Sequence, residues 1–333
     1  MLIRQARRAN LLARLCFLFE EQGLLDAVPS KARSHLESER AVAEAHERSV
    51  RWEAYQIRQA LEDLNVPVIL LKGGAYVLGG LPPGRGRLFH DMDILVPKGN
   101  LDAVEEALGL WGWVLTHLDA YDQRYYRQWM HELPPFRHMK RKTVLDVHHT
   151  ILPETSRLSP DPRKLIAAAQ ALNGQGCLKI LAPTDMVLHT ATHLFHDGEL
   201  DQGLRDLVDI DSLFRHFGRD ETFWPGLVKR ARELDLIRPL YYALRYTKAI
   251  LGTPVPEATQ QDIRIGRPGG LGPVLMDALF FRGLAPEHSS CETRFTGLAR
   301  WLLYVRSHRL RMPMHLLIPH LIRKAIKRRK ERA

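Results

Sequence analysis

Cysteine is scarce in this chain, and its distribution excludes two common means of stabilising a small fold. Among 333 residues there are three cysteines, which lie far apart at Cys16, Cys177 and Cys291. An odd number without paired spacing predicts neither a disulfide framework nor a zinc knuckle. Such cysteine usage is typical of a reducing compartment, so we expect a cytoplasmic location.

Long apolar runs and a secretory signal are lacking as well. Arg and Lys interrupt every candidate stretch before it reaches the roughly 18 residues that span a bilayer, so no transmembrane segment is expected. The first 20 residues carry four arginines inside an apolar pattern, which predicts an amphipathic helix and not a signal peptide. With 45% hydrophobic residues, the chain can still bury a substantial core.

Positive charge is present but unevenly distributed. The net charge is +10, and residues 300–333 alone hold eleven Lys or Arg against one acid. The rest of the chain is therefore balanced, which disfavours a long nucleic-acid track across the body of the protein. The basic run 322–330 could follow the phosphates of RNA or lie against anionic lipid. A frayed, solvated terminal helix is the plain alternative.

Periodicity divides the chain into three parts. Residues 1–64 are predicted to form an N-terminal helical segment. Residues 65–160 alternate between strand and helix, which indicates an α+β core, α/β-like in its alternation, around a small mixed sheet. Residues 161–333 are predicted to be predominantly helical, with a basic C-terminal tail. The expected core strands are 67–71, 92–96, 112–117 and 143–150, and the expected core helices are 74–79 and 100–110.

Two aspartates at the entrance to an apolar run are the most informative residues. Asp91 and Asp93 precede the run 94–96, and residues i and i+2 of an extended segment share one side. Both carboxylates can therefore converge on one cation, and Mg²⁺ prefers such oxygen ligands together with substrate phosphates. Most triplets of this kind are solvated acids at a loop-to-strand junction, so the pair gains weight only from its surroundings.

A glycine-containing turn and a basic loop come before this acidic pair. The preceding apolar run ends in Lys72, Gly73 and Gly74, and glycine permits close approach of the backbone to an anion. A helix that follows such a turn favours phosphate at its N-terminus. Two arginines of the next loop, Arg85 and Arg87, are candidates with Lys72 for neutralising a triphosphate. Arginines in such loops are also commonly just exposed.

A third carboxylate lies further along the chain. Residues 143–149 alternate apolar and polar side chains as in a half-buried strand, which places Asp146 and His148 on one face. Asp146 could bind a cation and draw a proton from an acceptor hydroxyl. By itself it would be taken as an exposed strand residue. We expect it to share one cleft with Asp91 and Asp93.

The ordered combination of these elements resembles the nucleotidyltransferase superfamily related to DNA polymerase beta, and within it the bacterial group of uncharacterised nucleotidyltransferases. The resemblance runs from about Val66 to His149, and more loosely to about Phe217. Its pattern is an apolar strand, Lys-Gly, a helix, an Arg-containing loop, Asp-x-Asp, an apolar strand, and a later strand with an acid and a histidine. Two positions depart from it: Gly74 stands where a serine is frequent, and His149 where an aromatic residue is frequent.

The resemblance implies transfer of a nucleoside monophosphate from an NTP to an acceptor, with release of pyrophosphate and with two Mg²⁺ or Mn²⁺ ions. It implies Asp91, Asp93 and Asp146 as catalytic metal ligands. It further implies that seven residues hold the nucleotide: Lys72, Gly73, Gly74, Arg85, Arg87, His148 and Arg205. The acceptor stays open between tRNA or other RNA, a small molecule, a sugar and a protein side chain.

Two interpretations from other functional classes are alternatives to the enzyme. A non-catalytic nucleotide- or RNA-binding component, of a toxin-antitoxin or polysaccharide system, is favoured by the departure at Gly74. A peripheral membrane protein is favoured by the apolar residues 301–304 together with the basic tail. Intact Asp91, Asp93 and Asp146 favour the enzyme.

Three further groups of residues leave their roles open. His189, His193 and His196 share a helix face and could suit a metal, although a structural or substrate-lining role is favoured. Arg205 and Asp209 could form a surface ion pair, or this segment could face the cleft. The aromatic and basic stretch from Tyr121 to Met139 could stack a base, but packing against the sheet is favoured.

Overall fold

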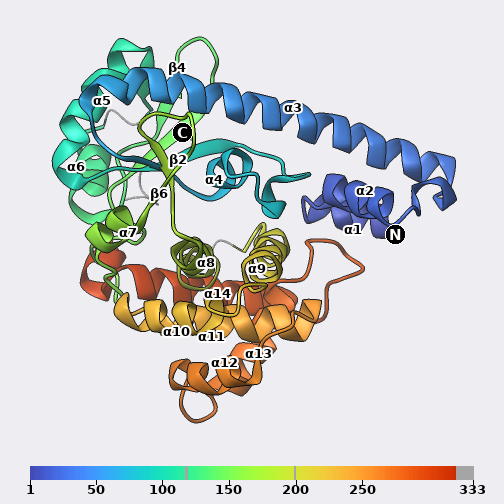
Figure 1. Cartoon of the computed structure of the whole chain (residues 1–333). Coiled ribbons are helices and arrows are strands. Elements are labelled where there is room, and N and C mark those ends of the chain that lie inside the picture. Colours follow the sequence, from blue (N-terminus) through green and yellow to red (C-terminus); the bar gives the residue numbers. More distant parts are fainter. Residues whose placement is uncertain (117–118, 199, 320–333) are drawn as a thin grey trace, which may run out of the picture.

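One mixed sheet and two sets of helices make up the protein. The structure, a computed structural model, describes residues 1–116, 119–198 and 200–319. The sheet lies between the long N-terminal helix and a layer of C-terminal helices (Figure 1). The predicted α+β class is therefore confirmed. The basic run 322–330, for which an RNA or lipid partner was considered, lies outside the described residues.

Seven strands form the sheet in the order β3-β4-β5-β2-β1-β7-β6. In its centre, β2 pairs antiparallel with β1 and parallel with β5, while β1 pairs parallel with β7. The central strands are rich in buried Val, Ile and Leu, as expected where both faces of a sheet are covered. The strands are β1 (Val68–Leu70), β2 (Asp91–Leu95), β3 (Trp113–Leu115), β4 (Phe136–His138), β5 (Val144–His148), β6 (Gln170–Ala171) and β7 (Leu178–Ile180).

The pairing of β2 with β5 determines which side chains meet. Asp93 lies directly beside Asp146, and Asp91 lies beside Val144. Because side chains alternate along a strand, Asp91, Asp93 and Asp146 stand on one face of the sheet. Their neighbours Met92 and Leu145 turn to the opposite face, where both are buried.

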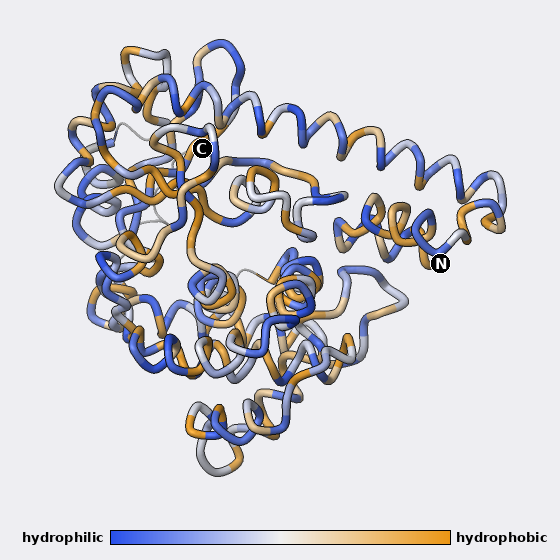
Figure 2. The backbone as a smooth tube through the Cα atoms, in the orientation of Figure 1, coloured by the Kyte–Doolittle hydropathy of each residue, from blue (hydrophilic) through white to orange (hydrophobic). Residues whose placement is uncertain are grey.

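The N-terminal helices are α1 (Leu2–Arg8), α2 (Leu12–Glu21) and α3 (Ser30–Leu61). Buried residues recur along α3 at helical spacing, at Leu36, Ala43, Val50, Ile57 and Leu61, while the remaining positions are largely polar. This alternation is visible along the helix (Figure 2). The N-terminal part of α3 packs against α2, and its C-terminal part packs against α4 and α5 (Figure 1). Helix α3 therefore connects α1 and α2 to the sheet.

A layer of helices covers the sheet on the opposite side from α3 (Figure 1). An aromatic cluster of Phe195, Tyr242, Tyr246 and Phe280 joins its members. The remaining α-helices are α4 (Lys72–Leu78), α5 (Leu101–Leu110), α6 (Ala120–Trp129), α7 (Pro162–Ala168), α8 (Pro183–Thr192), α9 (Gly203–Phe217), α10 (Phe223–Glu233), α11 (Ile237–Tyr246), α12 (Glu257–Asp262), α13 (Gly272–Gly283) and α14 (Thr296–Arg311). A π-helix, η5 (His193–Asp197), continues α8, and a short 3₁₀ turn, η3 (Pro82–Gly84), follows α4.

Several elements differ from the sequence expectation. Residues 161–180 were expected to be part of a helical region, yet β6 and β7 add two strands to the sheet, and β4 was not predicted. These strands have two or three residues each, too few for a readable alternation. Of the stretch from Tyr121 to Met139, the part up to Trp129 belongs to helix α6, where Tyr121 and Tyr125 both contact Trp129, and residues 136–138 form β4.

Candidate active site

A cavity of about 200 Å³ opens beside the acidic face of β2. Residues from β2, α4 and the loop after η3 form one wall, and residues from α8, η5 and α9 form the other. Six residues predicted from the sequence line it: Lys72, Gly73, Arg87, Asp91, Asp93 and Arg205. The sheet and the helical layer thus meet at these six residues.

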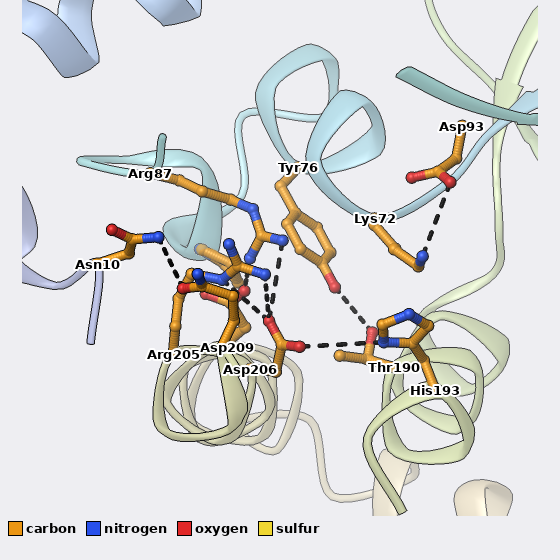
Figure 3. A network of polar contacts seen from close by, with 12 residues as sticks. Asn10, Lys72, Tyr76, Arg87, Asp93, Thr190, His193, Arg205, Asp206 and Asp209 are labelled. Atoms are coloured by element: carbon orange, nitrogen blue, oxygen red, sulfur yellow. Dashed lines mark hydrogen bonds and ion pairs between the residues drawn. The ribbon is translucent and has the colours of Figure 1, made fainter. Parts of the chain in front are cut away.

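Lys72, at the turn between β1 and α4, has an unusual backbone conformation. Its φ is 41°, in the left-handed region that L-residues other than glycine rarely adopt. Its ammonium nitrogen lies 3.7 Å from Oδ1 of Asp93 (Figure 3). A left-handed residue costs about 1–2 kcal/mol, and such conformations cluster at functional sites. The turn therefore directs a cation at the acidic face at some cost in stability.

This conformation gives a prediction on stability. We expect Lys72→Gly to be more stable than Lys72→Ala by about 1 kcal/mol, because glycine relieves the positive φ while both variants lose the ammonium group. Helix propensity alone predicts the reverse order, since alanine exceeds glycine by about 1 kcal/mol in a helix. Urea unfolding of both variants measures the difference. A less stable Lys72→Gly would show that the left-handed conformation carries no strain.

Asp93 is the most strongly engaged of the three aspartates. Its Oδ1 accepts a hydrogen bond from Nε2 of His148 at 3.1 Å, and only 7% of the residue is exposed. Burial opposes its ionisation, but Lys72 and the hydrogen bond from His148 outweigh burial and hold the pKa of Asp93 below its usual range. Asp93 is therefore an anion already paired with two basic groups.

Asp146 and Asp91 are held differently. Burial raises the pKa of Asp146 to about 8, and the nearby charges of Asp93 and Glu132 add to the effect. Its Oδ1 is buried and has no hydrogen-bond partner among the described residues. The pKa of Asp91 is also raised, by desolvation at the cavity wall and then by Asp93. Two carboxyl groups with raised pKa beside an ionised one form an acidic face that would gain from a cation.

His148 belongs to a second group of potential ligands. Its Nδ1 lies 3.5 Å from Oε2 of Glu132, and its ring stacks on that of His131 at 5.1 Å. Burial opposes protonation, but Asp93 and Glu132 raise the pKa of His148 above its usual value. Within the described ranges, His131, Glu132 and His148 are the one set of three such side chains whose ligand atoms lie within 4.8 Å of one another. The three aspartates share a face without meeting that distance.

A buried ion network closes the opposite side of the cavity (Figure 3). Asp209, 1% exposed, pairs with Arg87 and, at 3.0 Å, with Nη1 of Arg14 from α2. Asp206 pairs with its neighbour Arg205 at 2.8 Å and lies 3.9 Å from Arg87. Of the two predicted alternatives for this segment, the structure has the one in which the segment faces the cleft. Arg205 pairs with Asp206 and not with Asp209.

Three predicted nucleotide-binding residues do not line the cavity, namely Gly74, Arg85 and His148, and the predicted metal ligand Asp146 does not line it either. Arg85 is exposed, pairs with Glu21 and lies over the ring of Phe17, because the turn at Gly86 packs tightly against α2. Gly74 is buried behind the cavity wall, where an added Cβ would lie 3.1 Å from Cε of Met92. Glycine therefore stands in place of the serine that is frequent in similar proteins, at a position where the core of the sheet leaves little room for a side chain.

His189 of α8 and His196 of η5 are buried, whereas His193, which is partly exposed, reaches the cavity. His193 lines it and lies 3.9 Å from Asp206, and Thr190 of the same wall bonds the hydroxyl of Tyr76 at 2.7 Å. Burial lowers the pKa of His189 to about 3 and that of His196 to about 4, so both are neutral near pH 7. Their side chains therefore act as uncharged packing and lining groups.

Sequence reasoning missed the contribution of the N-terminal helices. Arg14 reaches Asp209, and Asn10, at the turn before α2, donates a hydrogen bond to Gln202 at 2.7 Å. Neither residue belongs to a recognisable motif, and each is about 190 positions from its partner. No local pattern could have found them.

Comparison with known families agrees with this arrangement. A model of a family described as uncharacterised nucleotidyltransferase matches residues 1–252, which includes the sheet, the cavity and α9. The chain belongs to this family. The predicted resemblance to the uncharacterised nucleotidyltransferases is thereby confirmed, and the match extends to the N-terminal segment that supplies Arg14 and Asn10. No curated protein and no solved structure is similar to this nucleotidyltransferase-family chain at a significant level.

Membership of the family supports a general role of the protein in nucleotidyl transfer. The matched span ends at residue 252, so α12, α13 and α14 lie outside it. Among the helices of the described ranges, none is long and apolar enough to cross a membrane.

Proposed function

We propose that the protein transfers a nucleoside monophosphate from an NTP to an acceptor, with Mg²⁺ or Mn²⁺ and with release of pyrophosphate. The observation that carries the proposal is the register of β2 and β5, which sets Asp93 beside Asp146 and Asp91 on one face of the sheet, next to the cavity. The family match supports the general reaction class. The metal, the nucleotide and the acceptor are part of the proposal.

The residues present fit a hard divalent cation. Asp91, Asp93 and Asp146 offer only oxygen atoms, which Mg²⁺ and Mn²⁺ prefer. The buried, unpartnered Oδ1 of Asp146 supports the same conclusion, because a buried polar atom without a partner is costly unless a ligand satisfies it. When bound there, the ions would neutralise phosphate charge and stabilise the entering and leaving oxygens.

The chain's own groups would bind and orient the nucleotide. Lys72 offers an ammonium group beside Asp93, where phosphate charge is expected. Gly73 leaves the cavity open, since an added Cβ would lie 2.6 Å from the ring of Phe89 and displace it. Arg87 and Arg205 are held by Asp209 and Asp206, so they line the cavity in fixed positions and would lose little entropy on binding a phosphate.

Asp146 is the proposed general base toward the acceptor. The pKa of this carboxyl group is raised to about 8 in the protein without an ion. A bound divalent cation would lower this pKa, so that the group could accept a proton near neutral pH. His148, two residues later, keeps Asp93 in place through its Nε2–H donor. The departure at Gly74 does not weaken the proposal, because that position faces Met92 instead of the cavity.

The test supplies the full-length protein with each NTP labelled at the α-phosphate, together with Mg²⁺ or Mn²⁺ and with fractions of cellular RNA, small molecules or protein. We expect label to enter one fraction, with release of pyrophosphate, and EDTA to abolish both. Asp91→Asn should reduce the transfer, whereas Asp102→Asn, which changes an exposed acid on α5, should not. Nucleotide binding without transfer or pyrophosphate release in any fraction would support the non-catalytic alternative instead.

A further inference from the structure

A second cavity, of about 490 Å³, lies among helices that the family match covers only in part. It is bounded by η5, α11, α13 and α14, by the loop around Arg157 and by residues 265–268. His196 lines it, whereas His193 of the same π-helix lines the active-site cavity. The two cavities are therefore separate spaces on either side of η5.

Three arginines line this second cavity without a carboxylate partner. Arg157, Arg238 and Arg306 form no ion pair with any acid in the described part of the chain. Arg157 and Arg238 are exposed, while Arg306 is held deeper, where its Nη1 donates to the carbonyl oxygen of Phe195 at 2.8 Å. The one acid of the lining is Asp235, which is exposed. The cavity thus carries a net positive charge.

The position of Arg306 makes the lack of a counter-charge costly. Its guanidinium lies over the rings of Tyr242 and Phe280, at 5.4 and 5.6 Å. Burial lowers its pKa, and the neighbouring Arg238 also lowers it. His196 is neutral near pH 7, since its pKa is lowered to about 4. A largely buried cation is stabilised by an anion brought into the cavity, because pairing offsets its desolvation.

The remaining lining is apolar. Leu158, Phe195, Ile237, Tyr242, Met276 and Leu310 form the walls beside the arginines. Pockets of this size, apolar with a few convergent polar groups, hold drug-sized ligands. An inorganic anion would satisfy the arginines but leave this apolar surface in contact with water.

We propose that this cavity binds a small amphipathic anion, with a phosphate or carboxylate group against Arg306 and an aromatic or aliphatic body against the apolar wall. The ligand enters past Arg157 and Arg238, which attract it by charge. Binding here does not depend on the proposed nucleotidyl transfer. The residues of α13 and α14 that line the cavity lie beyond residue 252, so the site is an addition to the family's matched region.

The experiment measures binding of anilinonaphthalene sulfonate, a fluorescent apolar anion, to the full-length protein. We expect saturable binding that octyl phosphate or octanoate displaces, and that octanol, inorganic phosphate and ATP do not. Displacement by octyl phosphate alone or by octanoate alone identifies the head group. Displacement by octanol to the same extent would overturn the proposal, because the arginines would then be unnecessary. Displacement by ATP would overturn the separation of the two sites.

Matched variants test the role of the arginines. Arg306→Met should weaken dye binding at least about tenfold, as expected for loss of a charge-assisted hydrogen bond, and Met276→Trp should weaken it by filling the cavity. Arg309→Met, which changes an exposed arginine of the same helix outside the lining, should leave binding unchanged. Arg238→Met at the exposed mouth serves if Arg306→Met does not fold, as judged by circular dichroism. Wild-type affinity in both arginine variants would refute the site.

Discussion

Replacement of Asp93 by asparagine is expected to lower the rate of nucleotidyl transfer by about 10²–10³-fold, the loss typical of removing one electrostatic group that acts on the transition state. Asparagine keeps the size of the side chain and can still accept the hydrogen bond from Nε2 of His148. It removes the charge that faces Lys72 and that would bind a divalent cation. The pKa of His148 should fall at the same time, since Asp93 is a main cause of its elevation.

Transfer of labelled nucleotide under single-turnover conditions measures the first effect, and NMR titration of the histidine ring measures the second. Asp102→Asn on the surface of α5 provides the control for a lost carboxylate that faces solvent. Wild-type activity in Asp93→Asn, with a folded protein, would show that the acidic face is not the catalytic site.

Asp209→Asn is expected to destabilise the protein by about 3–5 kcal/mol, the cost of removing one partner from a buried ion pair. The carboxylate is 1% exposed and faces both Arg87 and Arg14, so its loss leaves Arg14 without an acidic partner and leaves Arg87 with only Asp206, at 3.9 Å. The effect should appear in urea unfolding at any nucleotide concentration, because the network is part of the fold itself.

An exposed ion pair provides the matched comparison. Glu47 and Arg51 pair at 2.9 Å on the solvent side of α3, with side chains 38% and 50% exposed. Glu47→Gln should therefore cost less than about 1 kcal/mol. Equal losses in the two variants would mean that burial adds nothing to the Asp209 network.

The acidic face could be predicted from the sequence because both of its strands carry local signals. Alternation around Asp91 and Asp93, and again around Asp146 and His148, gives the side of each residue without knowledge of the partner strand. The parallel pairing of the two strands then places like faces together. Two correct local readings were sufficient for this part of the site.

Other parts depend on contacts that have no local pattern. Strands β6 and β7 join the sheet through β1, and their length of two or three residues is too short to read. Arg205 pairs with the adjacent Asp206, although helix geometry leads one to expect partners at i+3 or i+4. Arg85 fits the motif, but its loop packs on α2, so its side chain pairs with Glu21 and does not line the cavity. No motif describes this packing.

The parallel neighbours β2 and β5 have a consequence for how the protein reaches its folded state. Asp93 and His148, which bond to one another, are 55 positions apart in the chain. Closing a loop of this length costs conformational entropy before the contacts between the strands can offset that cost. Long-range parallel pairings therefore form slowly and late. A nascent chain that has emerged only as far as α5 carries both residues of the Asp-x-Asp pair but lacks the strand that completes their face. Ribosome-bound intermediates should therefore leave this edge of β2 unpaired for a time, exposed to association with other strands until β5 arrives.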